Sequence, residues 1–584
     1  MPETRWIPDR AFNPKTPFWT RANVGEVLPE PPSPAGWDLV FGNGGTIAGW
    51  TDCAIERLGV DREELDPDPN QGDWIGLFGG YGYLCATWIR VWGERTPGMS
   101  AAAIDAAYFG DHPDVPPYIK EPWHENPKTT EAMTGWLGWV MGTMEQDELE
   151  SDRLEARKIR ESRPDFTAMS ERELLDYATS LRSVCRRLFN QHINQSGAAS
   201  IGPGTIGAIC AAVGKPEAAM KLISGFGGVD SAAPSYAMWD LSRQVRASNA
   251  LSALFAQGPS GLAKRIQASE DPAARAFADA FFGGFLKEFG SRGPNEWDIA
   301  SDTWETSPDI ALAAIDRMRL APDSASPKAN NSAREAERKT TEAEVSALLA
   351  GDPETAATFE AALKSAATFV PGRERSKTNI IRVIQETRMA IWEIGHRHVA
   401  SGELSNPGDI CFLFEDELAA LAEGRLADLP ALVAERRAHY DWLLGLEPPF
   451  IINGTPPANT TWKNKGESAV DSVAAGTAIA GMPGCPGLAR GRARVVLDAS
   501  DPTVLEPGDI LVAPMTDPAW TPLFVPAAGV VVDVGAALSH AIIVSRELGI
   551  PCVVSATNAT RRIPDGAVIE VDGDAGTVTV ISLE

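Results

Sequence analysis

Residues 533–551 read DVGAALSHAIIVSRELGIP, and this stretch decides the fold of the C-terminal part of the chain. The apolar run 529–534 predicts a buried strand, and the small residues that follow it predict a tight turn. His540 then begins a predicted helix, which Ser539 caps and Gly549 ends. The order strand, small-residue turn, histidine and helix indicates an α/β domain with His540 at a helix N-terminus.

A histidine in this position has a specific chemistry. The free backbone N–H groups and the positive end of the helix dipole favour an anion there. The same field keeps an imidazole neutral and nucleophilic, and it stabilises a dianionic group bound to a ring nitrogen. His540 is therefore a candidate phosphohistidine. The alternative is a structural histidine that only satisfies its own hydrogen bonds at the start of a helix.

At these residues the chain resembles the mobile phosphohistidine domain of the PEP-utilising enzymes. That family includes PEP synthase, pyruvate phosphate dikinase, rifampicin phosphotransferase and phenylphosphate synthase. The resemblance begins near residue 480, and it includes GMPGCPGLARG at 481–491, PGDILVA at 507–513 and TDP at 516–518. It implies a swivelling α/β domain over 479–584 whose phosphate is carried by His540.

The resemblance also implies smaller features of this domain. Ser539 and Thr516 are expected to support the phosphate. Dikinases carry a regulatory threonine two places before the histidine, and Leu538 occupies that place here. Control through a phosphorylated threonine is therefore not expected.

Composition favours a multidomain protein of the cytoplasm. A chain of 584 residues exceeds what one core holds, so about two to four domains are expected. The net charge of −27 argues against nucleic acid and anionic membranes as partners. The seven cysteines lack CxxC spacing, which predicts neither disulfides nor a zinc site, and no other metal site is expected. No signal segment and no run of roughly 18 apolar residues is found.

The region 1–447 is predicted to be a mainly α-helical substrate-binding region. Helical periodicity is clear over 170–194, where Ser170 and Glu173 form a capping box, and over 376–400. Other helices are expected near 205–225, 236–257, 271–290, 308–318 and 342–368. Residues 321–339 are rich in Pro, Ser, Asn and charge, which predicts a loop or a disordered insertion. Residues 448–478 lack periodicity and are predicted to be the hinge linker.

Tryptophan is concentrated at the N-terminus, since ten of the 17 tryptophans precede residue 140. This distribution favours an aromatic pocket for an apolar or ring-shaped substrate. The alternative is ordinary core packing. The stretch FWTRANVGEVLP at 18–29 resembles the opening of the substrate-binding region of rifampicin phosphotransferase and phenylphosphate synthase, which implies substrate contacts for Trp19 and Glu26.

A second stretch, PGRERSK at 371–377, resembles an Arg-Glu-x-x-Lys element that lies near the docking site of the phosphohistidine in the same family. Arg373 and Lys377 are four residues apart, so both cations can share one helix face. Two fixed cations suit a phosphoryl group in transfer, and Glu374 or Glu26 is a candidate base. The alternative is a solvated salt-bridge surface formed with Glu374 and Glu386.

Several family features are missing from this sequence. It contains no Gly-Gly-Lys start and no Arg-Ser-Ser-Ala-x-x-Glu-Asp element of an ATP-grasp domain, and no Walker A loop. Few residues follow the mobile domain, whereas a (β/α)₈ barrel for PEP or pyruvate would need about 250. The resemblance therefore implies a partner ATP-grasp subunit that uses ATP and Mg²⁺ to phosphorylate His540.

These observations predict a phosphotransferase subunit of the phenylphosphate synthase type. The phosphoryl group would pass from His540 to the hydroxyl of a small apolar acceptor, most simply a phenol, as in aromatic catabolism. One alternative is a phosphocarrier or regulatory module that relays phosphate between proteins without a small-molecule acceptor. Another is a scaffold with a vestigial histidine.

Overall fold

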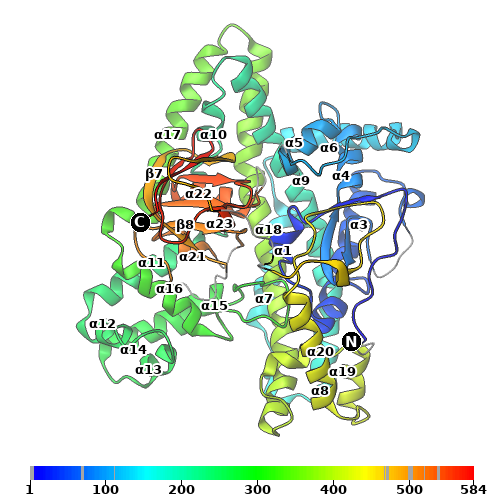
Figure 1. The fold of residues 1–584 in the computed structure, drawn as a ribbon, viewed down its shortest axis with the longest axis vertical. Coiled ribbons are helices and arrows are strands. Elements are labelled where there is room, and N and C mark those ends of the chain that lie inside the picture. Colours follow the sequence, from blue (N-terminus) through cyan, green and yellow to red (C-terminus); the bar gives the residue numbers. More distant parts are fainter. Residues whose placement is uncertain are drawn as a thin grey trace.

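The computed structural model describes residues 5–66, 71–110, 112–465, 467, 472–497, 504–517, 520–535 and 539–583. A large helical region and a C-terminal α/β domain lie side by side (Figure 1). This arrangement confirms the predicted fold class. The predicted turn residues Ala536, Ala537 and Leu538, and Pro518 of the TDP element, lie outside the described residues.

Two long helices, α9 (Arg182–Ala212) and α18 (Pro353–Ala400), form the centre of the helical region. Their backbones touch at Gly202, where an added Cβ would lie 2.6 Å from the Ala366 nitrogen and 2.7 Å from the Ala362 oxygen. A glycine is required there because any side chain would push the two helices apart.

The predicted helix over 170–194 is in fact two helices. The first, α8 (Glu171–Ser180), has the predicted capping box of Ser170 and Glu173, and the second is α9, which starts after Leu181. The helix predicted at 376–400 is the C-terminal half of α18, which contains Pro371 and ends before Gly402, whose φ is +83°. The helix continues through Pro371, where its second half becomes almost continuously buried.

The predicted stretch 342–368 contains the end of α17 (Pro327–Leu348) and the start of α18. Shorter helices surround the pair of α9 and α18, and they include segments in each of the remaining predicted helical stretches. They are α1 (Val24–Val27), α2 (Pro34–Gly36), α3 (Thr46–Glu56), α4 (Ala86–Arg95), α5 (Ala101–Phe109), α6 (Pro127–Gly142), α7 (Asp147–Glu161), α10 (Ala218–Leu222), α11 (Ala233–Ala247), α12 (Asn249–Phe255), α13 (Leu262–Ala268), α14 (Pro272–Ala278), α15 (Leu286–Phe289), α16 (Pro308–Leu320), α19 (Glu415–Ala422) and α20 (Leu429–Leu444).

The region predicted as a loop at 321–339 is largely helical, and this prediction is wrong. Helix α17 runs over Pro327–Leu348 and begins with proline at a position that needs no N–H donor. Its polar composition has two causes. One face carries solvent-exposed ion pairs such as Glu335 with Lys339, and Arg334 donates to the Pro486 carbonyl oxygen of the C-terminal domain at 3.1 Å.

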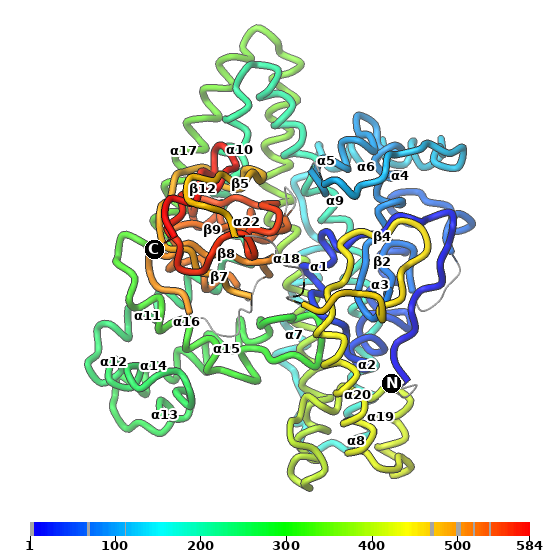
Figure 2. The backbone as a smooth tube through the Cα atoms, in the orientation of Figure 1, coloured from blue at the N-terminus to red at the C-terminus, as the bar shows by residue number. Residues whose placement is uncertain are grey.

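Part of the predicted hinge linker 448–478 belongs to a small sheet of the N-terminal region. The antiparallel order is β2 (Ile75–Phe78), β3 (Tyr81–Cys85), β1 (Phe18–Thr20) and β4 (Ile451–Asn453). Strand β4 pairs with β1 in the register Trp19 to Ile452, and Figure 2 shows this yellow segment beside the blue N-terminal chain. A three-residue strand gives no periodic signal in the sequence, so the pairing could not be predicted.

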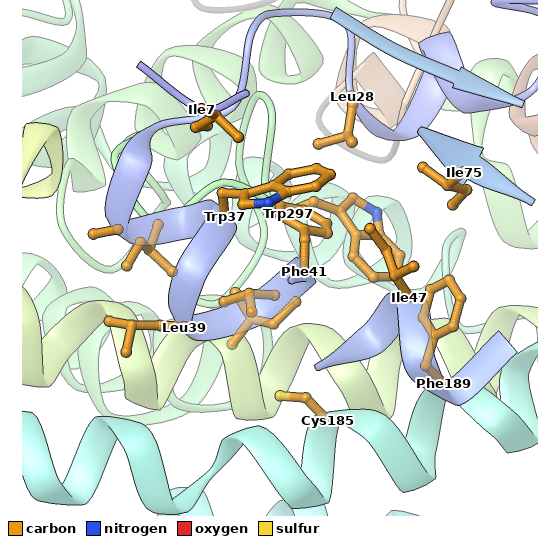
Figure 3. Packing of buried hydrophobic residues seen from close by; sticks show 14 of the residues in the cluster. Ile7, Leu28, Trp37, Leu39, Phe41, Ile47, Ile75, Cys185, Phe189 and Trp297 are labelled. Carbon is orange, nitrogen blue, oxygen red and sulfur yellow. The ribbon is translucent and has the colours of Figure 1, made fainter. Parts of the chain in front are cut away.

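Aromatic side chains fill the core of the N-terminal region. Trp37, Phe41 and Trp297 lie together above α9, which contributes Cys185 and Phe189 (Figure 3). Trp297 meets the Phe189 ring edge-on at a centroid distance of 5.9 Å. Such pairs add stability beyond the buried area alone.

The C-terminal domain is an eight-stranded sheet in the order β5-β12-β11-β7-β8-β9-β10-β6. Strands β7 to β10 are parallel neighbours and the outer pairings are antiparallel. The strands are β5 (Ala478–Ala480), β6 (Met482–Cys485), β7 (Leu488–Val495), β8 (Ile510–Ala513), β9 (Gly529–Val532), β10 (Cys552–Val554), β11 (Val568–Asp572) and β12 (Thr577–Ser582). The helices are α21 (Thr521–Phe524), α22 (His540–Leu548) and α23 (Ala559–Arg562).

The strand and helix predicted around His540 are confirmed. Strand β9 is fully buried, and α22 begins at His540 and ends at Gly549, whose φ of +69° favours glycine. Ser539 occupies the N-cap position with an extended backbone, but its side chain makes no capping hydrogen bond.

The C-terminal domain is docked on the helical region. Side chains of α11 and α16, such as Trp239 and Leu312, belong to one buried cluster with Phe524 and Ile542 of the C-terminal domain. The Glu547 carboxylate accepts hydrogen bonds from the backbone N–H groups of Phe226 and Gly227, both at 3.1 Å. In Figure 1, α10 and α17 lie above the domain, and α11 and α16 lie below it.

The close approach of α9 and α18 predicts opposite effects for two glycines of α9. Gly202→Ala should lower the free energy of unfolding by about 1–3 kcal/mol through overpacking. Gly207→Ala should leave it unchanged or raise it by up to about 1 kcal/mol, since alanine favours helix and an added Cβ there meets no atom within 4 Å. Thermal melts of both variants check this, and equal melting temperatures would contradict the close contact.

Candidate functional site

His540 is enclosed at the junction between the C-terminal domain and the helical region. Only 4% of its surface is exposed. Its Nδ1 lies 3.1 Å from the Thr516 hydroxyl and its Nε2 lies 3.0 Å from the Thr521 hydroxyl. The Phe524 ring meets the imidazole edge-on. Two hydroxyls and one aromatic ring therefore fix the plane of the imidazole.

The surroundings of His540 keep its ring neutral. Burial lowers the pKa of His540 well below its usual value, and the positive charges of Lys377, Arg292 and Arg373 lower it further. A neutral imidazole has a ring nitrogen with a free electron pair, which is the nucleophilic form. Ser539 directly precedes His540 in the chain. Its hydroxyl is buried and has no hydrogen-bond partner among the described residues.

Two successive turns of α18 carry the predicted cations. Arg373 forms an ion pair with Glu374, and Lys377 lies on the next turn with 8% of its surface exposed. Burial acts to raise the pKa of Glu374, but the charges of Arg373 and Lys377 outweigh it and hold that pKa below its usual value. Glu374 is therefore a carboxylate that fixes Arg373, and a weak base.

The predicted alternative is a solvated salt-bridge surface formed with Glu374 and Glu386. Arg373 does pair with Glu374, but that carboxylate is buried, and Glu386 pairs with other arginines. Glu386 is fully buried and accepts hydrogen bonds from Arg160 at 3.2 Å and from Arg163 at 2.6 Å. Arg373 and Lys377 lie close enough to His540 and Glu26 for their positive charges to lower the pKa values of both. We call Arg373 and Lys377 the α18 cations.

Glu26 reaches the same site from α1. The backbone N–H of His540 lies 3.5 Å from the Glu26 carboxylate, so residues more than 500 positions apart meet there. Burial raises the pKa of Glu26 to about 7, against the opposing charges of Arg373 and Lys377. Glu26 therefore exchanges its proton near neutral pH, as a general acid or base requires.

Four further residues at the site were not predicted from the sequence. Thr521 and Arg292 lie in no recognisable motif, and Arg292 donates to Glu296 at 2.8 Å and to Thr378 at 2.6 Å. Tyr108 lies close enough for Arg373 and Glu26 to influence its pKa, which burial raises. His192 shares a 2.9 Å hydrogen bond with Ser376 of α18.

Trp19 lies in the N-terminal core. Its indole N–H donates to the Thr16 carbonyl oxygen at 2.7 Å, its ring meets Phe78 edge-on, and 2% of its surface is exposed. These contacts are those of a core residue, and its predicted substrate contact remains a prediction. The other tryptophans in this region also pack on one another, as Trp50 does on Trp74 at a centroid distance of 6.2 Å.

Three general features of the described residues complete this description. No group of three or more His, Cys, Asp or Glu is placed to hold a metal ion within the described ranges. Over those same ranges, no helix combines the length and the apolar character that crossing a membrane requires. All seven cysteines are buried thiols.

Two family models match this chain. The fourth domain of rifampicin phosphotransferase matches residues 191–374, and the mobile domain of PEP-utilising enzymes matches residues 505–576. The first match includes Arg373 and Glu374, and the second includes Thr516 and His540. These matches confirm the predicted resemblance to PEP-utilising enzymes.

Individual relatives agree with these matches. Rifampicin phosphotransferase from Streptomyces sviceus is 33% identical over 303 residues, which are 51% of this chain and 34% of that protein. Prodigiosin synthesizing transferase from Serratia marcescens is 33% identical over 317 residues, 53% of this chain and 34% of that protein. An uncharacterized protein from Mycobacterium tuberculosis is 34% identical over 299 residues, which are 51% of this chain and 31% of that protein. The aligned part of the chain spans about a third of the length of these relatives.

The raised pKa of Glu26 predicts a pH-dependent contribution to stability. Between its ordinary pKa of 4.5 and about 7, the folded chain holds a proton that the unfolded chain has released. Stability from this group therefore falls as the pH rises through that window, by at most about 3 kcal/mol. Glu26→Gln should become progressively more stable relative to the wild type from pH 5 to pH 8, measured by denaturant unfolding.

The matched control is Glu125→Gln. That carboxylate is exposed, and its hydrogen bond with Lys120 lowers its pKa, so its variant should follow the wild-type profile from pH 5 to pH 8. A Glu26→Gln profile parallel to the wild type would contradict the assigned environment of Glu26.

Proposed function

We propose that this chain is a phosphotransferase component in which His540 carries a phosphoryl group to a hydroxyl acceptor bound at the helical region. The observation that carries the proposal is the meeting of a neutral, enclosed His540 with the α18 cations and Glu26. A histidine alone would have a structural explanation. A histidine beside two cations and a carboxyl that titrates near pH 7 has the parts that phosphoryl transfer needs.

The proposed phosphoryl transfer has two steps. A ring nitrogen of His540 attacks the phosphorus of a donor, so that a P–N bond forms and the bond to the leaving group breaks. The acceptor oxygen then attacks the same phosphorus, the P–N bond breaks and its electron pair returns to the ring nitrogen. Glu26 takes the proton of the acceptor hydroxyl. The α18 cations balance the charge on the transferring oxygens.

The choice of Glu26 over Glu374 as the base follows from their surroundings. Arg373 holds Glu374 in an ion pair, which removes its tendency to accept a proton. Glu26 has a pKa of about 7, and its carboxylate faces the first turn of α22. A base with a pKa near the working pH accepts a proton most effectively.

The docked arrangement corresponds to the acceptor half of the cycle. His540 is too enclosed to meet a large nucleotide-bearing domain, so loading requires the C-terminal domain to swing away. The proposed pivot lies between the Leu446–Asn464 bridge and β5, within the predicted linker 448–478, and residues 466 and 468–471 of it lie outside the described residues. The donor is proposed to be ATP with Mg²⁺ on a partner ATP-grasp subunit. The phenolic acceptor and phenol phosphorylation stay predictions.

The carrier role predicts covalent phosphate on His540. Treating the intact chain with phosphoramidate, a small phosphoryl donor that needs no partner, should give acid-labile phosphate that mass spectrometry localises to His540. His540→Ala should lose this label, and a circular dichroism spectrum like that of the wild type should show that the variant is folded. His398→Ala is the matched control and should keep the label. Equal labelling of His540→Ala would overturn the assignment.

The transfer role predicts slow discharge when either α18 cation is removed. Starting from pre-phosphorylated chain, Arg373→Ala and Lys377→Ala should each slow transfer to an alcohol by about 10²-fold or more, because each cation stabilises transition-state charge. The best acceptor from a panel of phenols and aliphatic alcohols serves as substrate. Lys364→Ala, an exposed lysine of the same helix, is the control. Normal discharge by both variants would place the transfer site elsewhere.

A further inference from the structure

A cavity of about 330 Å³ lies beside the site and takes no part in the chemistry described above. Residues of α7, α11, α15 and α18 contribute to its wall. Four arginines line it: Arg153, Arg292, Arg375 and Arg382. We call it the arginine cavity. Its size suits a small organic ligand.

Two of these arginines have unused hydrogen-bond donors. Arg382 is 5% exposed and donates through Nη2 to Glu288 at 2.7 Å, while its Nη1 is buried without a partner among the described residues. Arg375 lies 3.5 Å from Asp230, and its Nε makes no hydrogen bond there. Arg382 is a buried cation with an unsatisfied N–H group, which is costly, and Arg375 is partly exposed. An oxyanion in the cavity would give both guanidinium groups a further counter-charge.

The carboxylates in the wall do not meet this need. Glu150 is engaged by Arg153 at 2.7 Å, and Glu288 is shared between Arg382 and Arg157. Burial raises the pKa of Asp230, and its carboxylate oxygen lies 3.5 Å from the Arg375 Nε without a hydrogen bond. Each of the four arginines therefore has one carboxylate neighbour, which for Arg292 is Glu296, outside the wall. Among the described residues, these carboxylates leave the Nη1 of Arg382 and the Nε of Arg375 unsatisfied.

The arginine cavity adjoins the transfer site through Arg292 and Thr378. Arg292 lines the cavity, donates to the Thr378 hydroxyl, and lowers the pKa of His540. Thr378 lines the cavity and follows Lys377 directly in α18. A ligand in the cavity would thus lie next to residues that surround the phosphoryl group during transfer.

We propose that the arginine cavity binds the oxyanion of the acceptor, a carboxylate or a phosphate, while the acceptor hydroxyl faces His540. The inference rests on the proposed function and narrows its acceptor to an anionic hydroxyl compound, in place of the apolar phenol expected from the sequence. Arginine forks match both oxyanions through paired hydrogen bonds, so the anion anchors the molecule and orients the hydroxyl.

Binding is tested without any phosphoryl transfer. Calorimetric titrations of the intact chain are carried out with malonate, inorganic phosphate and neutral malonamide at constant ionic strength. Either malonate or phosphate should bind saturably, and malonamide should not bind. Arg375→Gln, at a partly exposed position, should weaken oxyanion binding by about tenfold or more through loss of a charge-assisted fork. Arg382→Lys, which keeps the charge but loses the fork, should weaken it as well.

Two controls complete this experiment. Arg437→Gln removes an exposed arginine that pairs with Asp409 and Asp441, and it should leave binding unchanged. His540→Ala should also retain binding, because the cavity is separate from the carrier nitrogen. The absence of saturable oxyanion binding, or binding that Arg375→Gln and Arg382→Lys leave intact, overturns the proposal.

Acceptor preference separates this inference from the proposed function. Phospho-His540 should discharge to 3-hydroxybenzoate or 3-phosphoglycerate with a KM about tenfold or more below that of the neutral 3-hydroxybenzamide or glycerol, because only the anionic member of each pair pairs with arginine. Arg375→Gln should raise KM for the anionic acceptor with little change in kcat. Equal use of anionic and neutral acceptors overturns the inference and leaves the carrier intact. A His540 that is never phosphorylated overturns the carrier, and oxyanion binding is then judged by calorimetry alone.

Discussion

The approach of the His540 imidazole to the cations of α18 is the interaction on which the rest of the structure depends. Two positive charges beside a buried histidine are tolerable only while the ring is neutral, and the lowered pKa of His540 meets that condition. Glu374 and Glu26 supply the compensating negative charge. In the proposed cycle, a phosphoryl group on the ring adds negative charge, so the docked arrangement is stabilised most when His540 has a group to deliver.

Docking requires more than this electrostatic contact. The apolar cluster shared by α11, α16 and α22 excludes water from the junction, and the Glu547 carboxylate satisfies two backbone N–H groups of the helical region. The proposed swing of this domain therefore has to separate an apolar contact as well as these hydrogen bonds.

Sequence predicted the local features of this protein well. The strand β9, the helix start at His540 and the ending at Gly549 depend on neighbouring residues, and all three were correct. The errors have physical causes. Helix α17 reads as a loop because its polar residues are stabilised by ion pairs and by contact with a distant domain. Strand β4 pairs with β1 across more than 400 residues, which leaves no periodic trace.

Prediction of the site residues also succeeded for local motifs and failed for residues defined by tertiary contacts. The short motifs around Glu26, Arg373 and Lys377 could be recognised, and the structure brings them together with His540. Thr521 and Arg292 could not be found, because nothing in their own segments distinguishes them from ordinary polar residues. Their role comes from tertiary contacts, Thr521 with a ring nitrogen of His540 and Arg292 with Thr378.

Helix α18 connects the transfer site with the arginine cavity by its periodicity. Residues 373 and 377 are four apart and share one face, and the charges of both lower the pKa of His540. Residues 375, 378 and 382 are spaced by three and four and share another face, which lines the cavity. Helix α18 is held against α9 at Gly202, so it fixes the distance between two sets of residues. One set is the α18 cations, proposed to bind the phosphoryl group, and the other is the arginines of the cavity, proposed to bind the acceptor. Reactive groups placed on one rigid element lose little freedom on reaction, which is how positioning lowers a barrier.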